Sequence, residues 1–292
     1  MSAGNPISGY NINNSLRFRA SASAYLSRTP SSAGNRTTWT YSFWVKKTQM
    51  GFASPQQLFG AYSATNGSGL FWNNSNDTLY FYMDGVGNVI ITSQVFRDPS
   101  AWYHIVLVWN TTSATSTISG GSTDRVRLYV NGTQVSSFST TTVPAQNATG
   151  NYINNTNTHE IGRNVGSQNY LDGYLAEINF IDGQALTPSS FGQTSTTTGV
   201  WQPKAYTGTY GTNGFYLKFS DIATTSGSNA GLGKDFSGNS NYWTTNNISV
   251  TSGTTYDAMI DSPTNASASG TQPVGNYAVW NPVDKDSATV IV

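Results

Sequence analysis

The sequence predicts an all-β protein, an antiparallel sandwich of two sheets, and three observations carry this prediction. Only two glutamates, Glu160 and Glu177, occur in 292 residues, while Ser, Thr, Asn and Gly, which are poor helix formers, are abundant. Apolar and polar side chains alternate in several short segments, which is the period of a strand with one face in water. Turn dipeptides such as Asn131-Gly132 separate these segments. Many short strands with polar connections are typical of a sandwich.

Each strand is predicted from its own pattern. The segment 16–20 alternates apolar residues with arginines, and the segment 39–45 places four large apolar side chains on one side. Residues 102–109 are apolar on both faces except at His104, as expected of a central strand that is covered twice. Asn131-Gly132 predicts a type I′ hairpin, because both turn positions need positive φ. Further strands are expected at 79–83, 89–93, 126–130, 133–138, 174–181 and 215–219.

One short helix and several domain boundaries complete the predicted organisation. The helix is expected after Asp182-Gly183, where Thr187 can cap it and Pro188 fits its first position. The predicted units are an N-terminal arm at 1–11, the sandwich at 12–200, a Gly/Tyr/Asn-rich extension at 201–260, a linker at 261–275 and a last segment at 276–292.

The later units are defined by what they lack. The extension has too little apolar material for a core of its own, so we expect it to pack on the sandwich. The last segment starts an alternating pattern and ends in the β-branched run 288–292, which indicates the start of a further β module or an exposed strand that pairs with a neighbouring subunit. Whether the natural chain continues past Val292 stays open.

Composition excludes several functional classes. The formal net charge is +0 with only 10% charged residues, which disfavours nucleic-acid binding because that needs clustered Lys and Arg. The absence of cysteine excludes disulfides, thiolate zinc sites and cysteine nucleophiles. No secretory signal and no apolar run long enough to span a bilayer is visible. The 13% aromatic content argues against disorder, since large rings supply most of the driving force of a core.

Three motifs resemble one domain family. The run from Leu171 to Pro188, LDGYLAEINFIDGQALTP, resembles the closing strand and capped turn of laminin G-like, concanavalin A-like lectin-glucanase domains. The segments 102–109, WYHIVLVW, and 126–132, VRLYVNG, are similar to two further strands of that family and follow in its order. The resemblance implies a jelly-roll sandwich over about residues 12–192.

Longer phrases resemble virion proteins of marine, cyanophage-like tailed bacteriophages. They are SLRFRASASAYLSRTP, QVFRDPSAWYH, YLAEINFIDGQAL, YGTNGFYLKFSD and LGKDFSGNSNYW. This resemblance implies a structural protein of a tail fibre, spike or capsid appendage, assembled in the host cytoplasm and located in the virion. Such appendages commonly form symmetric trimers, so the expected partners are other virion proteins and further copies of this chain.

A catalytic function is not expected. Glucanases of the resembling superfamily hold two carboxylates on one strand, whereas Glu160 and Glu177 lie seventeen residues apart and outside such a pattern. We expect Glu177 to be a structural carboxylate held by backbone or an arginine. His104 is expected to be a buried, hydrogen-bonded core residue, and His159 a loop residue. No nucleophile elbow occurs.

Calcium is the one cofactor that the resemblance suggests, since related domains hold it with loop aspartates. No other cofactor is expected. Calcium prefers six to eight oxygen ligands, usually with several carboxylates. The candidates stand alone in the sequence, three of them in Asp-Gly turns that the aspartate itself stabilises. These candidates are Asp77, Asp84, Asp124, Asp172 and Asp182.

Glycan binding is a more specific hypothesis than calcium binding. Sugars are recognised by aromatic faces, with amides and hydroxyls bonded to their OH groups, and the predicted loops carry both kinds of residue. The candidates are Tyr62, Trp72, Tyr152 and Tyr170, with Asn73, Asn74, Asn154 and Asn155. The alternative is that these rings fill the rim of the sandwich or subunit contacts, since Tyr and Trp are also favoured at interfaces.

Three functions are compatible with these patterns. The favoured one is a non-enzymatic virion protein that presents its sandwich to a glycan on the host surface. The second is a decoration or cement protein of the capsid or tail that binds no sugar. The third is a polysaccharide-degrading spike, for which no reducing-end release is expected.

Overall fold

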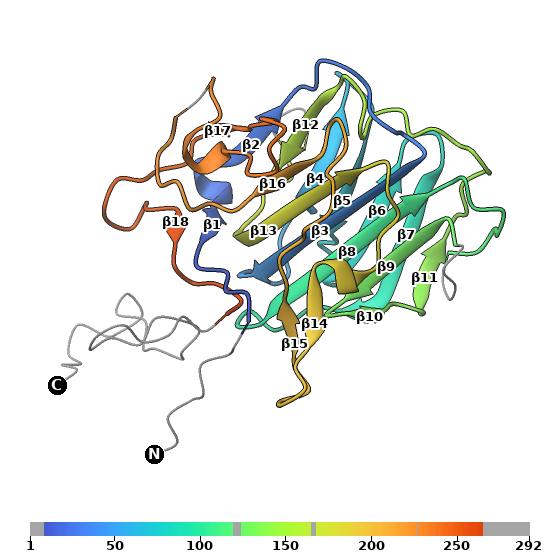
Figure 1. The fold of residues 1–292 in the computed structure, drawn as a ribbon, viewed down its shortest axis with the longest axis horizontal. Coiled ribbons are helices and arrows are strands. Elements are labelled where there is room, and N and C mark those ends of the chain that lie inside the picture. Colours follow the sequence, from blue (N-terminus) through green and yellow to red (C-terminus); the bar gives the residue numbers. More distant parts are fainter. Residues whose placement is uncertain (1–8, 119–123, 165–167, 226, 265–292) are drawn as a thin grey trace.

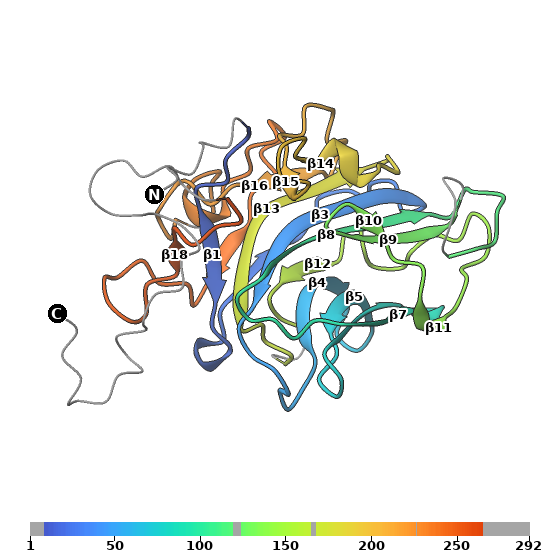
Figure 2. The same ribbon diagram turned by 90° about the horizontal axis from the view of Figure 1, so that it is seen from below.

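The computed structural model describes residues 9–118, 124–164, 168–225 and 227–264, and it is a sandwich of two antiparallel sheets (Figure 1). Sheet A has the strand order β10-β9-β8-β3-β13-β1-β18, with β16 also paired to β13. Sheet B has the order β11-β7-β6-β5-β4-β12-β2-β17. A separate hairpin, β14–β15, lies on the side of sheet A that faces away from sheet B (Figure 2). The predicted jelly-roll sandwich is therefore confirmed.

The strands and single-turn 3₁₀ helices of the described chain have the following bounds. They are β1 (Ser15–Phe18), η1 (Ala20–Ala22), β2 (Tyr25–Arg28), β3 (Thr38–Lys47), β4 (Gln56–Tyr62), β5 (Gly67–Trp72), β6 (Thr78–Met83), β7 (Gly87–Val95), β8 (Trp102–Asn110), β9 (Val126–Val130), β10 (Thr133–Gln134), β11 (Phe138–Thr141), β12 (Thr158–Ile161), β13 (Gly173–Asp182), η2 (Pro188–Ser190), β14 (Gly192–Thr194), β15 (Trp201–Pro203), β16 (Phe215–Leu217), η3 (Gly231–Gly233), β17 (Thr244–Asn246) and β18 (Ala258–Met259).

The core between the sheets is aromatic, as the composition predicts. Trp39 of β3 is fully buried and contacts the rings of Phe81, Trp109 and Phe180, with centroids 5.8 to 6.2 Å apart. Such ring pairs stabilise a fold by about 0.5 to 1.5 kcal/mol each beyond the area they bury. Since Trp39, Trp109 and Phe180 come from sheet A and Phe81 from sheet B, this cluster joins the two layers.

The predicted Asn131-Gly132 hairpin turn is confirmed, whereas Asp172-Gly173 forms no turn because Gly173 begins β13. Asn131 and Gly132 have φ of 48° and 79°, the positive values that the hairpin between β9 and β10 requires. The predicted helix is a single 3₁₀ turn, η2, preceded by Thr187. The hydroxyl of Thr187 makes no capping bond and instead pairs with the hydroxyl of Ser189.

Strands of the extension join both sheets. β16 pairs with β13 and β18 with β1 in sheet A, whereas β17 pairs with β2 at the edge of sheet B. The domain boundaries inferred from the sequence stay a prediction. The predicted last strand at 288–292 and most of the predicted linker lie outside the described residues.

Candidate functional site

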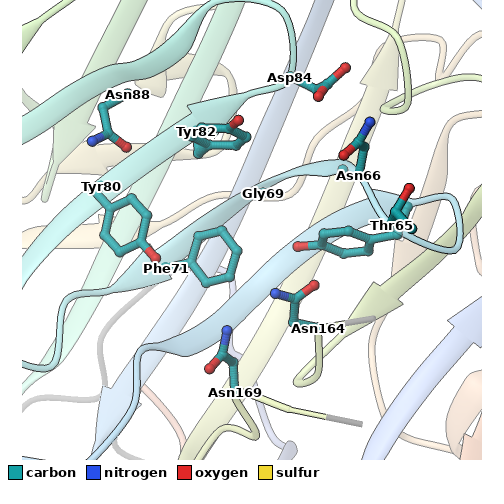
Figure 3. Close-up of a pocket in the computed structure, with 12 residues that line it drawn as sticks. Thr65, Asn66, Gly69, Phe71, Tyr80, Tyr82, Asp84, Asn88, Asn164 and Asn169 are labelled. Atoms are coloured by element: carbon teal, nitrogen blue, oxygen red, sulfur yellow. The ribbon is translucent and has the colours of Figure 1, made fainter. Parts of the chain in front are cut away.

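The candidate site is a cavity on the outer face of sheet B, over β4, β5 and β6. Alternation along β5 and β6 directs Leu70 and Phe81 into the core and leaves Phe71, Tyr80 and Tyr82 on the opposite face. These three rings line a cavity of about 330 Å³, the lower end of the range for small-molecule sites. The other lining residues are Tyr62, Thr65, Asn66, Gly67, Gly69, Asp84, Asn88, Asn164 and Asn169, most of them labelled in Figure 3.

Glycines in β4 and β5 let the ring of Tyr62 lie flat against the sheet. A Cβ atom at Gly67 would lie 1.8 Å from Cδ1 of Tyr62, and Cβ atoms at Gly60 and Gly69 would lie 2.4 and 2.6 Å from its hydroxyl oxygen. Any side chain at these positions would displace the ring. The hydroxyl of Tyr62 donates to Oε1 of Gln57, and burial raises the pKa of Tyr62 well above its usual value, so the ring is held as a neutral floor.

The other rings extend this floor toward solvent. Phe71 and Tyr80 stack with centroids 4.9 Å apart and planes at 10°. Burial raises the pKa of Tyr80 to about 12, so its hydroxyl stays protonated at neutral pH. Tyr82 is 36% exposed, which leaves part of its ring open to a ligand.

Four amides around the floor have unused hydrogen-bonding capacity. The side chains of Asn66, Asn88, Asn164 and Asn169 make no hydrogen bond to another residue of the described chain. Oδ1 of Asn164 is shielded from water as well as unpaired. Because each amide offers two donors and an acceptor, this set can bond several hydroxyl groups of a ligand.

Charge is sparse in this cavity. Among the described lining residues, Asp84 carries the one carboxylate, and none carries a cationic side chain. Nδ2 of Asn151 donates to the Asp84 carboxylate at 2.8 Å. The site therefore favours neutral, hydroxyl-bearing ligands over anions.

A second hollow of about 490 Å³ adjoins the first and shares Tyr62 with it. It is lined by Thr158 and Glu160 of β12 and by Arg163. Arg163 donates from Nε to Glu160 at 3.0 Å, and its guanidinium lies 3.6 Å from the centre of the Tyr25 ring. Its charge is therefore already compensated.

Only one of the eight predicted glycan ligands, Tyr62, lines the main cavity. Trp72 was expected in a loop, but it ends β5 with no exposed surface and contacts Phe96 and Lys47, so its ring is unavailable to a ligand. Asn73 and Asn74 fold the β5–β6 turn, where Asn73 accepts from Ser75 and Asn74 donates to the carbonyl of Ala53.

The remaining four lie in other loops. Tyr152 packs against the core, and Asn155 donates to the carbonyl of Asn151. Asn154 is 1% exposed and donates to Asp182 at 2.6 Å. Tyr170 interacts with Arg163. The signal that could have found the cavity is the outward register of Phe71, Tyr80 and Tyr82, which lie in strands and not in the loops where the sugar-binding rings were expected.

The five aspartates predicted as calcium ligands lie apart and serve local structure. Asp77 is 6% exposed and pairs with Lys47 and Arg97, and these partners hold the pKa of its carboxyl below its usual value against the effect of burial. Asp84 lines the main cavity and accepts a hydrogen bond from Asn151.

The other three accept hydrogen bonds from neutral groups. Asp124 accepts from Thr117, Asp172 from the backbone of Ala20, and Asp182 from the backbone of Asn35 and Asn213. Within the described ranges no three His, Cys, Asp or Glu side chains form a group able to hold a metal ion. The arrangement of these carboxylates gives the calcium prediction no support.

Both histidines are buried and neutral. Nδ1 of His104 accepts from the indole N–H of Trp201, so its proton lies on Nε2 and is donated to Ser42, and burial lowers the pKa of His104 to about 3. This confirms the predicted core role. His159 is not the predicted loop residue: it lies in β12, is 4% exposed and accepts from the backbone N–H of Asn154, while burial lowers its pKa to about 4.

Glu177 is structural, but its partners differ from those expected. It occupies an irregularity of β13 with φ of 51°, and the hydroxyls of Tyr10 and Tyr216 donate to it instead of backbone or an arginine. Burial raises the pKa of Glu177 to about 7. It is covered on the outer face of sheet A, away from the cavity.

The fold and the cavity together define a lectin-like β-sandwich. The profile of the laminin G family within the concanavalin A-like lectin/glucanases superfamily matches residues 20–191. The chain belongs to this superfamily. No curated protein matches the sequence. None of the described helices is long and apolar enough to cross a membrane.

Several solved structures superpose on part of this chain. A heptameric SAP-like pentraxin from Limulus polyphemus is 17% identical, with a TM-score of 0.43 over 61% of this chain and 80% of the pentraxin. A candidate carbohydrate-binding protein from Bacteroides ovatus is 16% identical, with a TM-score of 0.49 over 81% of this chain and 59% of that protein. Domains LG4-5 of the mouse laminin α1 chain are 13% identical, with a TM-score of 0.40 over 63% and 45% of the two chains. At these scores the overlaps carry no information on ligands.

Proposed function

We propose that this chain binds a neutral glycan in the cavity on the outer face of sheet B. The observation that supports this most is the pairing of an aromatic floor with four amides that have no other partner in the described chain. Tyr62, Phe71, Tyr80 and Tyr82 would contact the C–H faces of the sugar, and the amides would bond its hydroxyls. The strand glycines beneath Tyr62 keep the floor flat enough for a ring to rest on it.

Binding without bond cleavage is the second part of the proposal. Glycoside hydrolysis generally needs two carboxyl groups on either side of the scissile bond. Among the described residues that line the cavity, only Asp84 carries a carboxylate. The adjoining hollow adds Glu160, which is held in an ion pair with Arg163. This distribution favours a lectin over a polysaccharide-degrading spike.

The biological setting that we propose is a virion appendage of a tailed bacteriophage, in which the chain forms a homotrimer and displays sheet B outward. This part rests on the resemblance of sequence phrases such as YLAEINFIDGQAL and LGKDFSGNSNYW. A capsid or tail decoration protein with no sugar binding is the alternative. Binding of the purified chain to glycans or host cells favours the first, and binding only to purified capsids or tails favours the second.

A glycan array probed with the full chain tests the proposal. We expect binding to neutral oligosaccharides, weakened roughly tenfold by Tyr82→Ala and by Asn88→Ala, since each removes one contact of about 1 to 1.5 kcal/mol. The control is Gln94→Ala, an exposed residue of the same sheet outside the cavity, which should bind as the wild type does. A chain that binds no glycan, or cavity variants that bind as tightly as Gln94→Ala, would refute the proposed function.

A further inference from the structure

A separate pocket of about 330 Å³ lies between β2 and the extension, away from the glycan cavity. Its lining is almost entirely hydroxyl and amide groups around one cation, Arg28. None of the described lining residues is acidic. The lining residues are Ser27, Arg28, Thr29, Ser31, Ser240, Asn241, Tyr242 and Thr244.

Arg28 carries a charge that no carboxylate of the described chain pairs with directly. It forms no ion pair there, whereas other basic residues such as Arg19, Lys47 and Arg163 each pair with a carboxylate. The nearby acid whose charge affects Arg28 is Asp235. Both oxygens of Asp235 are already occupied, by the backbone N–H groups of Tyr216, Ser237 and Asn241 and by the hydroxyl of Ser237.

The guanidinium is held in place by one side of Asn241. Nη2 of Arg28 donates to Oδ1 of Asn241, and Nδ2 of Asn241 donates to the carbonyls of Thr212 and Gly214 at 2.9 and 2.8 Å. Since a guanidinium has five N–H donors, four remain without a hydrogen-bond partner in the described ranges. The guanidinium is thus fixed in position, and most of its N–H donors are available to a ligand.

Burial makes this unused charge costly. It lowers the pKa of Arg28 to about 10, so the side chain stays cationic at neutral pH although it has lost part of its hydration. An oxyanion placed against the free donors would restore the lost interactions, and arginine suits carboxylate and sulfate because its planar donors match their oxygens.

We infer that this pocket binds the carboxylate or sulfate group of an acidic sugar, with Arg28 as the anion-binding residue. The hydroxyls of Ser27, Thr29 and Thr244 then face the hydroxyls of the sugar. The pocket volume exceeds what a bare inorganic ion needs and falls in the lower range of small-molecule sites. This site differs in charge from the glycan cavity, where Asp84 supplies a carboxylate.

Titration of the full chain by NMR, followed on the arginine Nε–H signals at fixed ionic strength, tests this inference. The probes are glucuronate, glucose 6-sulfate, glucose and inorganic sulfate. We expect glucuronate and the sulfated sugar to shift the Arg28 signal with saturation, and Arg28→Gln to weaken binding at least about tenfold, the usual effect of losing a charge-assisted hydrogen bond. Arg28→Lys should retain part of the affinity because it keeps the charge.

Controls separate this site from the fold and from the glycan cavity. Arg36→Gln alters another half-buried arginine outside the pocket and should leave the glucuronate affinity unchanged. Tyr82→Ala should also leave it unchanged, so failure of the proposed function does not affect this test. Thr244→Val removes one lining hydroxyl and should weaken binding a few-fold, which serves as the test if Arg28→Gln does not fold.

Three outcomes would overturn the inference. The first is glucose binding as tightly as glucuronate, which would make the charge irrelevant. The second is unchanged affinity in both Arg28→Gln and Thr244→Val. The third is inorganic sulfate binding as tightly as the sulfated sugar, which would show that the pocket recognises a free ion and not a saccharide.

Discussion

The outer faces of the two sheets use the same kinds of residue in opposite ways. On sheet A, the hairpin β14–β15 and residues 206–210 cover the face, and Tyr129 and Ile181 are buried beneath this layer (Figure 2). On sheet B, Tyr80 and Tyr82 point outward with no such layer of described residues over them and line an open cavity (Figure 3). The difference shows that the covering segments, and not the strand sequences, decide which rings are available to a ligand.

On the outer side of each sheet, a large aromatic ring packs over glycines. On the side of sheet A, Trp201 packs over Gly132 of the β9–β10 turn and Gly192 of its own hairpin, where added Cβ atoms would lie 2.3 and 2.4 Å from its indole. Trp201 of β15 also donates its indole N–H to His104 of β8, and this hydrogen bond links the covering hairpin to sheet A. On sheet B, Tyr62 lies over glycines in the same manner, but its outer side forms the floor of a cavity. The same packing of a ring over glycines therefore helps to cover the outer face of sheet A and forms the floor of an open cavity on sheet B.

The largest effect is expected from loosening the extension that borders sheet A. Asp257 has a fully buried side chain that accepts hydrogen bonds from Arg17 and Arg19 of the sandwich and from the backbone of Ser249. Asp257→Asn should lower the free energy of unfolding by about 3 kcal/mol, because it leaves two arginines without their counter-ion. Urea denaturation followed by tryptophan fluorescence measures this loss.

Asp261 is the matched control for that change. It belongs to the same segment and pairs with Lys46, but its side chain is 27% exposed. Asp261→Asn should cost about 1 kcal/mol, less than Asp257→Asn, because the Asp261 side chain is partly open to water. Equal losses in the two variants would mean that the ion pairs of Asp257 with Arg17 and Arg19 do not hold the extension in place.

The second prediction concerns the carboxylate buried under the covered face. Burial raises the pKa of Glu177 to about 7 in the folded chain from an unfolded value of 4.5, although the hydroxyls of Tyr10 and Tyr216 and the charge of Lys218 oppose this rise. The folded state therefore binds the Glu177 proton more tightly. The contribution of Glu177 to stability is present below about pH 4.5 and is lost as the pH rises to about 7, by as much as about 3 kcal/mol.

Glu177→Gln isolates this contribution. The two buried histidines change stability in the opposite direction, because their pKa values are lowered to about 3 and about 4, so the informative quantity is the difference between wild type and variant at each pH. We expect the variant to gain stability relative to wild type as the pH rises from 4.5 to 7.5. A difference that stays constant over this range would show that Glu177 titrates normally and is open to water.

How much the sequence predicts differs between the two sheets. The long apolar runs of β3, β8 and β13 predict the centre of sheet A, since a strand covered on both faces is apolar on both. In sheet B, β4 and β5 escape prediction because Gly60, Gly67 and Gly69 interrupt them, and glycine weakens a strand signal. The same glycines shape the floor of the cavity, so the property that hides these strands also creates the site.

Other features leave no local signal. Trp201 and His104 are 97 residues apart in the chain, and only the folded hairpin brings their rings within hydrogen-bonding distance. Phe71 and Tyr82 look like ordinary strand residues until their register places them outward. The sugar-binding rings were predicted in loops, and of those rings only Tyr62, which ends a strand, lines the cavity.

The smallest effect is expected on the open face. Tyr82→Ala should change the free energy of unfolding by less than about 0.5 kcal/mol, because the ring is 36% exposed and lies outside the described apolar clusters. The same variant should weaken glycan binding roughly tenfold, so stability and binding separate at this position. Urea denaturation of the variant used on the glycan array measures the first quantity. A loss above about 2 kcal/mol would mean that the ring is packed as tightly as those under the cover of sheet A, and the open face would then be a structural surface with no ring to offer a sugar.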